Sequence, residues 1–166
     1  LAEARRICEE EQLPLYNALG DRREIAVTRG KIADILQAQG ELDAALEMHL
    51  SRLPGAEERK DADSIAHIRY SCAGIRLARG DHERGELQVI YDELAEAFGI
   101  VMQIGRAEGI GGIGVLLGQV LAMARQTDEA LAVLSTAQEA FERLGNAGGR
   151  EQCDQLIRMI SGGDDT

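Results

Sequence analysis

The sequence has few aromatic residues and almost no proline. Only 5 of its 166 residues are aromatic, none is Trp, and the prolines are Pro14 and Pro54 alone. Strands favour aromatic and β-branched residues, whereas Ala, Leu, Glu, Arg and Gln, which are frequent here, favour helix. The composition therefore argues against an all-β sandwich and predicts an all-α fold.

Cysteine and long apolar runs are scarce too. Cys8, Cys72 and Cys153 are far apart, odd in number and form no Cys-x-x-Cys pair. Neither a disulfide framework nor a zinc site is indicated. No apolar run approaches the length of a membrane span, and the first residues show no signal-peptide pattern. These absences predict a cytoplasmic protein with free thiols and no membrane partner.

Basic residues are in deficit, with 18 Lys and Arg against 29 Asp and Glu and a net charge of −11. Affinity for a phosphate backbone comes from clustered Lys and Arg, so the balance argues against nucleic acid as a partner. The same sign predicts a protein or peptide partner with a basic or apolar segment. Because 45% of the residues are hydrophobic, the chain still has enough apolar surface for a core.

An internal repeat is present instead. The recurring pairs are Gly40-Glu41, Gly80-Asp81 and Arg125-Gln126 at one turn, and Leu19-Gly20, Ile104-Gly105 and Leu144-Gly145 at the other. Lys60 stands where a further glycine is expected. Both series advance by 40 residues, with one step of 45, so a single five-residue insertion between Gly80 and Gly105 reconciles them.

Each repeat reads as two helices, because apolar residues recur at helical spacing on either side of Gly40. A glycine at this point can take the left-handed conformation that ends a helix. The pattern predicts repeats over 21–60, 61–105 and 106–145. We expect 1–20 to be the second helix of a truncated upstream repeat, 146–161 to be a capping helix and 162–166 to be a polar tail.

These units resemble tetratricopeptide repeats. The run from Gly40 to Leu46, Gly-Glu-Leu-Asp-Ala-Ala-Leu, follows the family's Gly-Asp-aromatic-Asp-Glu-Ala-Leu, with Leu42 in place of the aromatic residue. Small residues stand where paired helices of the family touch, at Ala33, Ala45, Ala73, Gly85, Gly118, Ala130 and Ala137. Departures from the pattern occur at Arg52, Arg76 and Asp92. The 40-residue period is similar to the longer variants in kinesin light chain and in bacterial regulators.

The resemblance implies a right-handed superhelical stack of antiparallel helical hairpins, an α-solenoid of about three repeats plus terminal helices. In the family the first helix of each repeat lines the concave side. Alignment of the units places there Lys31, Asp34, Gln37, His67, Tyr70 and Gln119. For Tyr70, a role as a peptide anchor and a role in packing both stay open. The chaperone-tail clamp of some members needs Lys and Asn where Gly30 and Asp34 stand, which argues against capture of a C-terminal carboxylate.

One motif suggests other chemistry. Gly109-Ile-Gly111-Gly-Ile-Gly114 is formally the Gly-x-Gly-x-x-Gly of a dinucleotide-binding turn. That turn needs a strand leading directly into its first glycine, and residues 105–108 intervene. The repeat register places the glycines in a helix instead, where they permit close helix approach. A nucleotide-binding enzyme that uses Gly109, Gly111 and Gly114 is therefore the weaker alternative.

No other constellation predicts catalysis. The three histidines share no metal-ligand spacing, and His49 is expected to be a packing residue. No nucleophile, base and orienting group can be named together. The sequence thus predicts a non-catalytic protein- or peptide-binding scaffold without cofactor or metal, a fragment of a longer array in a multidomain protein. A ligand- or peptide-sensing regulatory domain is the alternative, and an apolar face over Leu1–Leu15 predicts self-association through the array ends.

Overall fold

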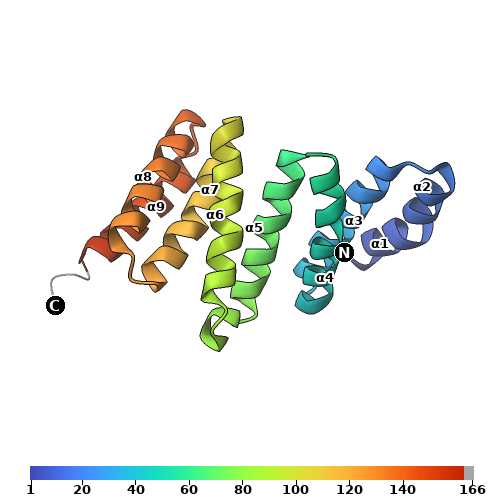
Figure 1. The fold of residues 1–166 in the computed structure, drawn as a ribbon, viewed down its shortest axis with the longest axis horizontal. Coiled ribbons are helices and arrows are strands. Elements are labelled where there is room, and N and C mark those ends of the chain that lie inside the picture. The colour runs from blue at the N-terminus through green and yellow to red at the C-terminus, as the bar shows by residue number, and fades with distance from the viewer. Residues whose placement is uncertain (163–166) are drawn as a thin grey trace. The chain divides into compact units, whose positions relative to one another are not determined.

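The computed structural model describes residues 1–162, and none of them lies in a strand (Figure 1). In chain order the helices are α1 (Ala2–Arg6), α2 (Leu13–Leu19), α3 (Arg22–Ala38), α4 (Leu42–Glu58), α5 (Ala62–Ala78), α6 (Leu87–Ile104), α7 (Ala107–Met123), α8 (Thr127–Arg143) and α9 (Ala147–Gly162). A π-helical stretch, η1 (Ile7–Gln12), joins α1 to α2, and a 3-10 turn, η2 (Asp81–Arg84), precedes α6. No helix in the described part of the chain is both long and apolar enough to cross a membrane.

The chain divides into two compact units, Leu1–Gly80 and Asp81–Thr166. In the first unit, the N-terminal helix, α3, α4 and α5 each pack against the next. In the second unit, α6, α7, α8 and α9 do the same, and α9 also contacts α7. Short turns make successive helices antiparallel. The predicted all-α stack of helical hairpins is therefore confirmed within each unit.

The turns share one backbone conformation. A residue with a positive φ lies one or two positions past the last residue of each helix from α2 to α8, at positions 20, 40, 60, 80, 105, 125 and 145. Two amides at such a turn bond back to the preceding helix, as when Gly40 N donates to Gln37 O at 3.0 Å and Glu41 N donates to Leu36 O at 2.9 Å. This is the Schellman pattern, which satisfies carbonyls at a helix end. The turn spacing found in the sequence is thus the spacing of helix ends.

Lys60 and Arg125 take the left-handed conformation without being glycine, with φ of 54° and 59°. A side chain in this region costs about 1–2 kcal/mol. We therefore expect Lys60→Gly to stabilise the first unit by about 0.5–1 kcal/mol, the relief being partly offset by the greater freedom of glycine in the unfolded chain. Urea unfolding measures the change. Lys31→Gly, an exposed site inside α3, is the control and should lose about 1 kcal/mol; a loss at both positions would contradict the prediction.

The five extra residues lie before α6, as η2 and Gly85. Gly85 is exposed and has φ of 92°, and a Cβ atom added to it would meet no heavy atom within 4 Å. The expectation that Gly85 lies where paired helices touch is therefore wrong. The fully buried Ile90 stands five residues after its turn glycine, as the buried Ala45 and Ala130 stand five residues after the left-handed residues of their own turns. The five-residue insertion therefore shifts the helix-contact position of this repeat by five residues, from Gly85 to Ile90.

Helix α7 contains the glycine motif. A Cβ atom at Gly111 would lie 2.6 Å from Cε1 of Phe141, and one at Gly118 would lie 2.6 Å from Cγ of Leu134. At Gly114 it would lie 2.9 Å from Cβ of Ala137. These contacts bring α8 against the glycine face of α7. Residues 109–114 therefore form no strand–turn–helix of the kind that dinucleotide binding requires, and the packing interpretation accounts for them.

The chain ends and the cysteines complete the fold. Helix α9 continues to Gly162, one residue past the predicted boundary at 161, and the rest of the predicted tail, 163–166, lies outside the described residues. The first predicted helix spans α1, η1 and α2 without leaving right-handed backbone at its junctions. All three cysteines are buried free thiols.

Candidate binding pocket of the first unit

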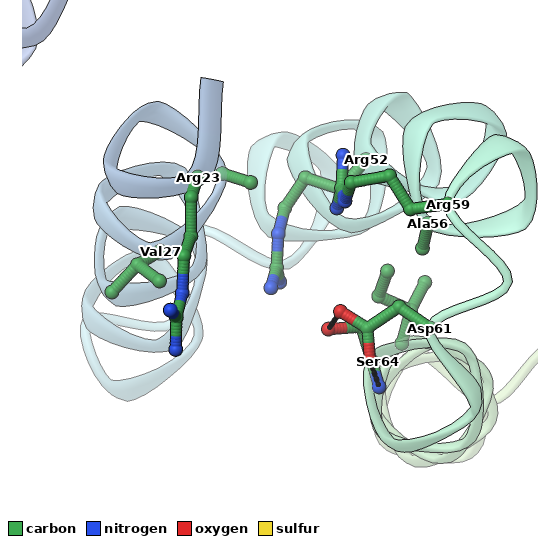
Figure 2. A pocket seen from close by; sticks show the side chains of 9 residues that line it. Arg23, Val27, Arg52, Ala56, Arg59, Asp61 and Ser64 are labelled. Atoms are coloured by element: carbon green, nitrogen blue, oxygen red, sulfur yellow. Dashed lines mark hydrogen bonds between the residues drawn. The ribbon is translucent and has the colours of Figure 1, made fainter. Parts of the chain in front are cut away.

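A cavity of about 490 Å³ opens between α3, α4 and α5 in the first unit. Its lining combines small apolar side chains with three arginines and one carboxylate (Figure 2). The lining residues are Arg23, Ala26, Val27, Arg52, Ala56, Arg59, Asp61, Ser64 and Ile68. We call this cavity the arginine pocket.

Helical spacing explains why these residues meet. Residues 23, 26 and 27 share one face of the first turns of α3, and residues 52, 56 and 59 share one face of α4. Residue 61 caps α5, while 64 and 68 follow one and two turns later. Three helix faces thus converge on one cavity.

Asp61 is held by its capping role. Its carboxylate accepts hydrogen bonds from Ser64 N at 3.1 Å and from Ser64 Oγ at 2.7 Å. The hydrogen bond from the Ser64 side chain, followed by the backbone bond and by the charges of Arg59 and Arg23, lowers the pKa of Asp61. The pocket therefore contains one ionised carboxylate, which already accepts two hydrogen bonds from Ser64.

Arg52 enters the pocket because the helix opposite has no side chain there. A Cβ atom at Gly30 would lie 2.8 Å from Nη2 of Arg52. Figure 2 shows the Arg52 side chain extending from α4 toward the space beside α3. The departure of Arg52 from the repeat pattern is thus matched by a glycine on the neighbouring helix.

The ring of His49 contacts the guanidinium of Arg52 and orients it. His49 is fully buried, and its Nδ1 lies 3.2 Å from Nη1 of Arg52. Burial, and then the charges of Arg52 and His67, lower the pKa of His49 to about 4. The ring is therefore neutral at pH 7, which lets Nδ1 accept a hydrogen bond from the guanidinium.

The other side of the His49 ring faces the predicted concave surface. Its Nε2 lies 3.7 Å from Oδ1 of Asp34, and its ring centroid lies 6.1 Å from that of His67 in an edge-on arrangement. The burial of His49 that the sequence predicted is confirmed. The ring lies between Asp34 and Arg52, an arrangement that the sequence did not indicate, although Nε2 makes no hydrogen bond within residues 1–162.

The guanidinium groups of the pocket lack carboxylate partners. Within residues 1–162, no carboxylate forms an ion pair with Arg23, Arg52 or Arg59. Nε of Arg52 is buried without a hydrogen-bond partner, and burial lowers the pKa of Arg52, an effect that the charge of Asp34 opposes. A planar guanidinium with free donors suits a carboxylate or phosphate.

A second hollow of about 190 Å³ shares Ala26, Arg52 and Arg59 with the arginine pocket. Arg22 and Arg29 also line it, and no acidic residue does. Arginine therefore dominates both hollows, although the whole chain carries a net charge of −11.

The predicted concave-face residues lie beside this pocket without lining it. Lys31, Asp34 and Gln37 are exposed on α3, His67 and Tyr70 are exposed on α5, and Gln119 is half-buried on α7 of the second unit. Of these, Asp34 and His67 meet at His49. Sequence reasoning missed Arg23, Arg52 and Arg59; the available signal was Arg52, which breaks the small-residue pattern, together with Gly30.

Among residues 1–162, no three His, Cys, Asp or Glu side chains lie close enough together to bind a metal ion. Comparison with known proteins adds no assignment. No protein-family model matches the sequence, and no curated protein matches it significantly. The resemblance to tetratricopeptide repeats thus stays a prediction, and the pocket has to be interpreted from its own chemistry.

Proposed function

We propose that the chain is a non-catalytic scaffold of helical repeats that binds a peptide segment of another protein. The observation that carries the proposal is the arginine pocket, an open cavity whose lining is part apolar and part arginine, with an Arg52 donor that lacks a hydrogen-bond partner. Such a combination suits recognition, because apolar contact contributes affinity and a few placed polar groups fix the orientation of the ligand. A tetratricopeptide-like origin and a cytoplasmic location belong to the same proposal.

The charge of the partner depends on the surface considered. The net charge of −11 favours a basic or apolar segment over the surface as a whole. The arginine pocket has the opposite local sign, with three arginines against Asp61. A partner segment that binds in this pocket therefore faces a positively charged lining, whereas the net charge alone favours a basic or apolar segment.

Filling the pocket should abolish peptide binding there. Val27 is 41% exposed on the pocket wall, so Val27→Trp places a large ring in the cavity without disturbing the buried core. We expect at least about tenfold weaker binding of any peptide that the chain selects from a random library, measured by fluorescence anisotropy.

Val89→Trp is the matched control, because Val89 is 42% exposed on α6 in the second unit. It should leave the affinity unchanged. Equal loss in both variants would show that tryptophan acts non-specifically, and unchanged binding in both would place the peptide elsewhere. Failure to select any peptide from the library would overturn the proposed function.

A further inference from the structure

We infer that the arginine pocket and its neighbouring hollow bind an acidic peptide segment, whose side-chain carboxylate or phosphate groups pair with Arg52, Arg59 and Arg23. This inference rests on the proposed function and names the chemical class of its ligand. The net charge of the whole chain predicts a basic or apolar partner, whereas the ligand inferred for this pocket is acidic.

Arg52 gives the first argument. Its half-buried guanidinium donates through Nη1 to His49, yet Nε is buried without a partner. Burying a charge is costly unless it is paired and hydrogen-bonded. Gly30 makes room for the group and His49 holds it in place. An oxyanion bound beside Nε would supply the missing partner.

The arrangement of arginines gives the second argument. Arg52 and Arg59 border both hollows, while Arg23 belongs to the first and Arg22 and Arg29 to the second. Two adjoining positively charged hollows offer places for more than one anionic group. A peptide with successive acidic side chains uses both, whereas a single small anion occupies one.

The surrounding acids favour a short peptide over nucleic acid. Asp61 lies in the pocket, and Asp34 is exposed close to His49. A long phosphate backbone would extend from the arginines over a molecule of net charge −11, where repulsion opposes it. A short acidic segment can keep its charges within the two hollows.

Binding of labelled peptides to the purified chain tests the inference. The probes are a glutamate-rich peptide, the same peptide with Gln for Glu, the same peptide with phosphoserine for Glu, and a single-stranded oligonucleotide. We expect the glutamate or phosphoserine peptide to bind at least about tenfold more tightly than the glutamine peptide, and to weaken as salt is added. Preference between the two acidic peptides then assigns carboxylate or phosphate.

Arginine variants locate the site. Arg23→Gln and Arg59→Gln change exposed side chains, and each should weaken the acidic peptide about tenfold, as expected for loss of a charged hydrogen bond. Arg143→Gln, an exposed arginine on α8 in the second unit, is the matched control and should not change the affinity.

Gly30→Ala tests the orientation of Arg52 without removing a charge. The new methyl group would displace the flexible guanidinium, so the acidic peptide should bind about tenfold more weakly while urea unfolding shows no loss of stability. A merely structural role for Arg52 would leave binding unchanged.

The outcomes separate the two proposals. Equal affinity for the glutamate, phosphoserine and glutamine peptides overturns the anionic ligand, and tighter binding of the oligonucleotide than of any peptide overturns the peptide as the occupant of the pocket. In either case, a peptide selected from the random library that binds the chain leaves the scaffold function in place. Equal weakening by Arg23→Gln and Arg143→Gln overturns the location. If none of these peptides binds and the random library also yields none, both proposals fail together.

Discussion

Alanine at both Gly111 and Gly118 should destabilise the second unit by about 2–4 kcal/mol. The added methyl groups would lie 2.6 Å from the Phe141 ring and 2.6 Å from Cγ of Leu134. Both neighbours are buried, so neither can move aside freely. Overpacking typically costs about 1–3 kcal/mol at each position, and the higher helix propensity of alanine returns less than about 1 kcal/mol. Urea unfolding, with hydrogen exchange in α7 and α8, measures the loss.

The same helix offers a control for this prediction. Gly112 lies between the two sites, and a Cβ atom there meets no heavy atom within 4 Å. Gly112→Ala should therefore stabilise the unit by about 0.5–1 kcal/mol. Stabilisation by all three substitutions would show that α7 and α8 do not pack through the glycine face. Destabilisation by Gly112→Ala would show that another contact occupies this position.

Local signals predicted much of the fold. A helix end with a left-handed residue is set by the few residues around it, so Gly40 and even Lys60 could be placed from the turn spacing alone. The insertion was located between Gly80 and Gly105, but its position inside that interval was not. Gly85 is a turn glycine like the others, and sequence spacing cannot tell a turn glycine from a helix-contact glycine when the register shifts.

The pocket could not be predicted in the same way. Arg52 and Gly30 are 22 positions apart on different helices, and only their packing shows that one makes room for the other. The alignment of repeats directed attention to the concave-face positions, while the pocket arginines lie on α3, inside α4 and at the end of α4. Net charge also conceals local clusters of charge. A pocket lined by arginines can be positively charged although the whole chain is negatively charged.

Acidification should weaken the first unit by up to about 3 kcal/mol between pH 6.5 and pH 4. Burial and the charges of Arg52 and His67 lower the pKa of His49 to about 4 from its ordinary value of 6.5. In this pH range His49 is protonated in the unfolded chain but stays neutral in the folded one. Because the unfolded state binds the extra proton, the free energy of unfolding decreases as the pH falls. Above pH 6.5 both states carry a neutral ring, and His49 contributes no pH dependence. Asp34 would attract a protonated ring, but its carboxylate is 57% exposed and therefore screened.

His49→Gln isolates the contribution of the ring. Glutamine does not titrate, and its amide oxygen can accept a hydrogen bond from Arg52. Carboxylates with lowered pKa values, such as Glu3 and Asp61, are common to both proteins, so their share cancels in the difference between the two stability curves. Urea unfolding should show the wild type losing up to about 3 kcal/mol more than the variant from pH 6.5 to pH 4. Parallel curves would mean that the ring accepts a proton in the folded state as readily as in the unfolded one, and that a cationic His49 beside Arg52 is tolerated.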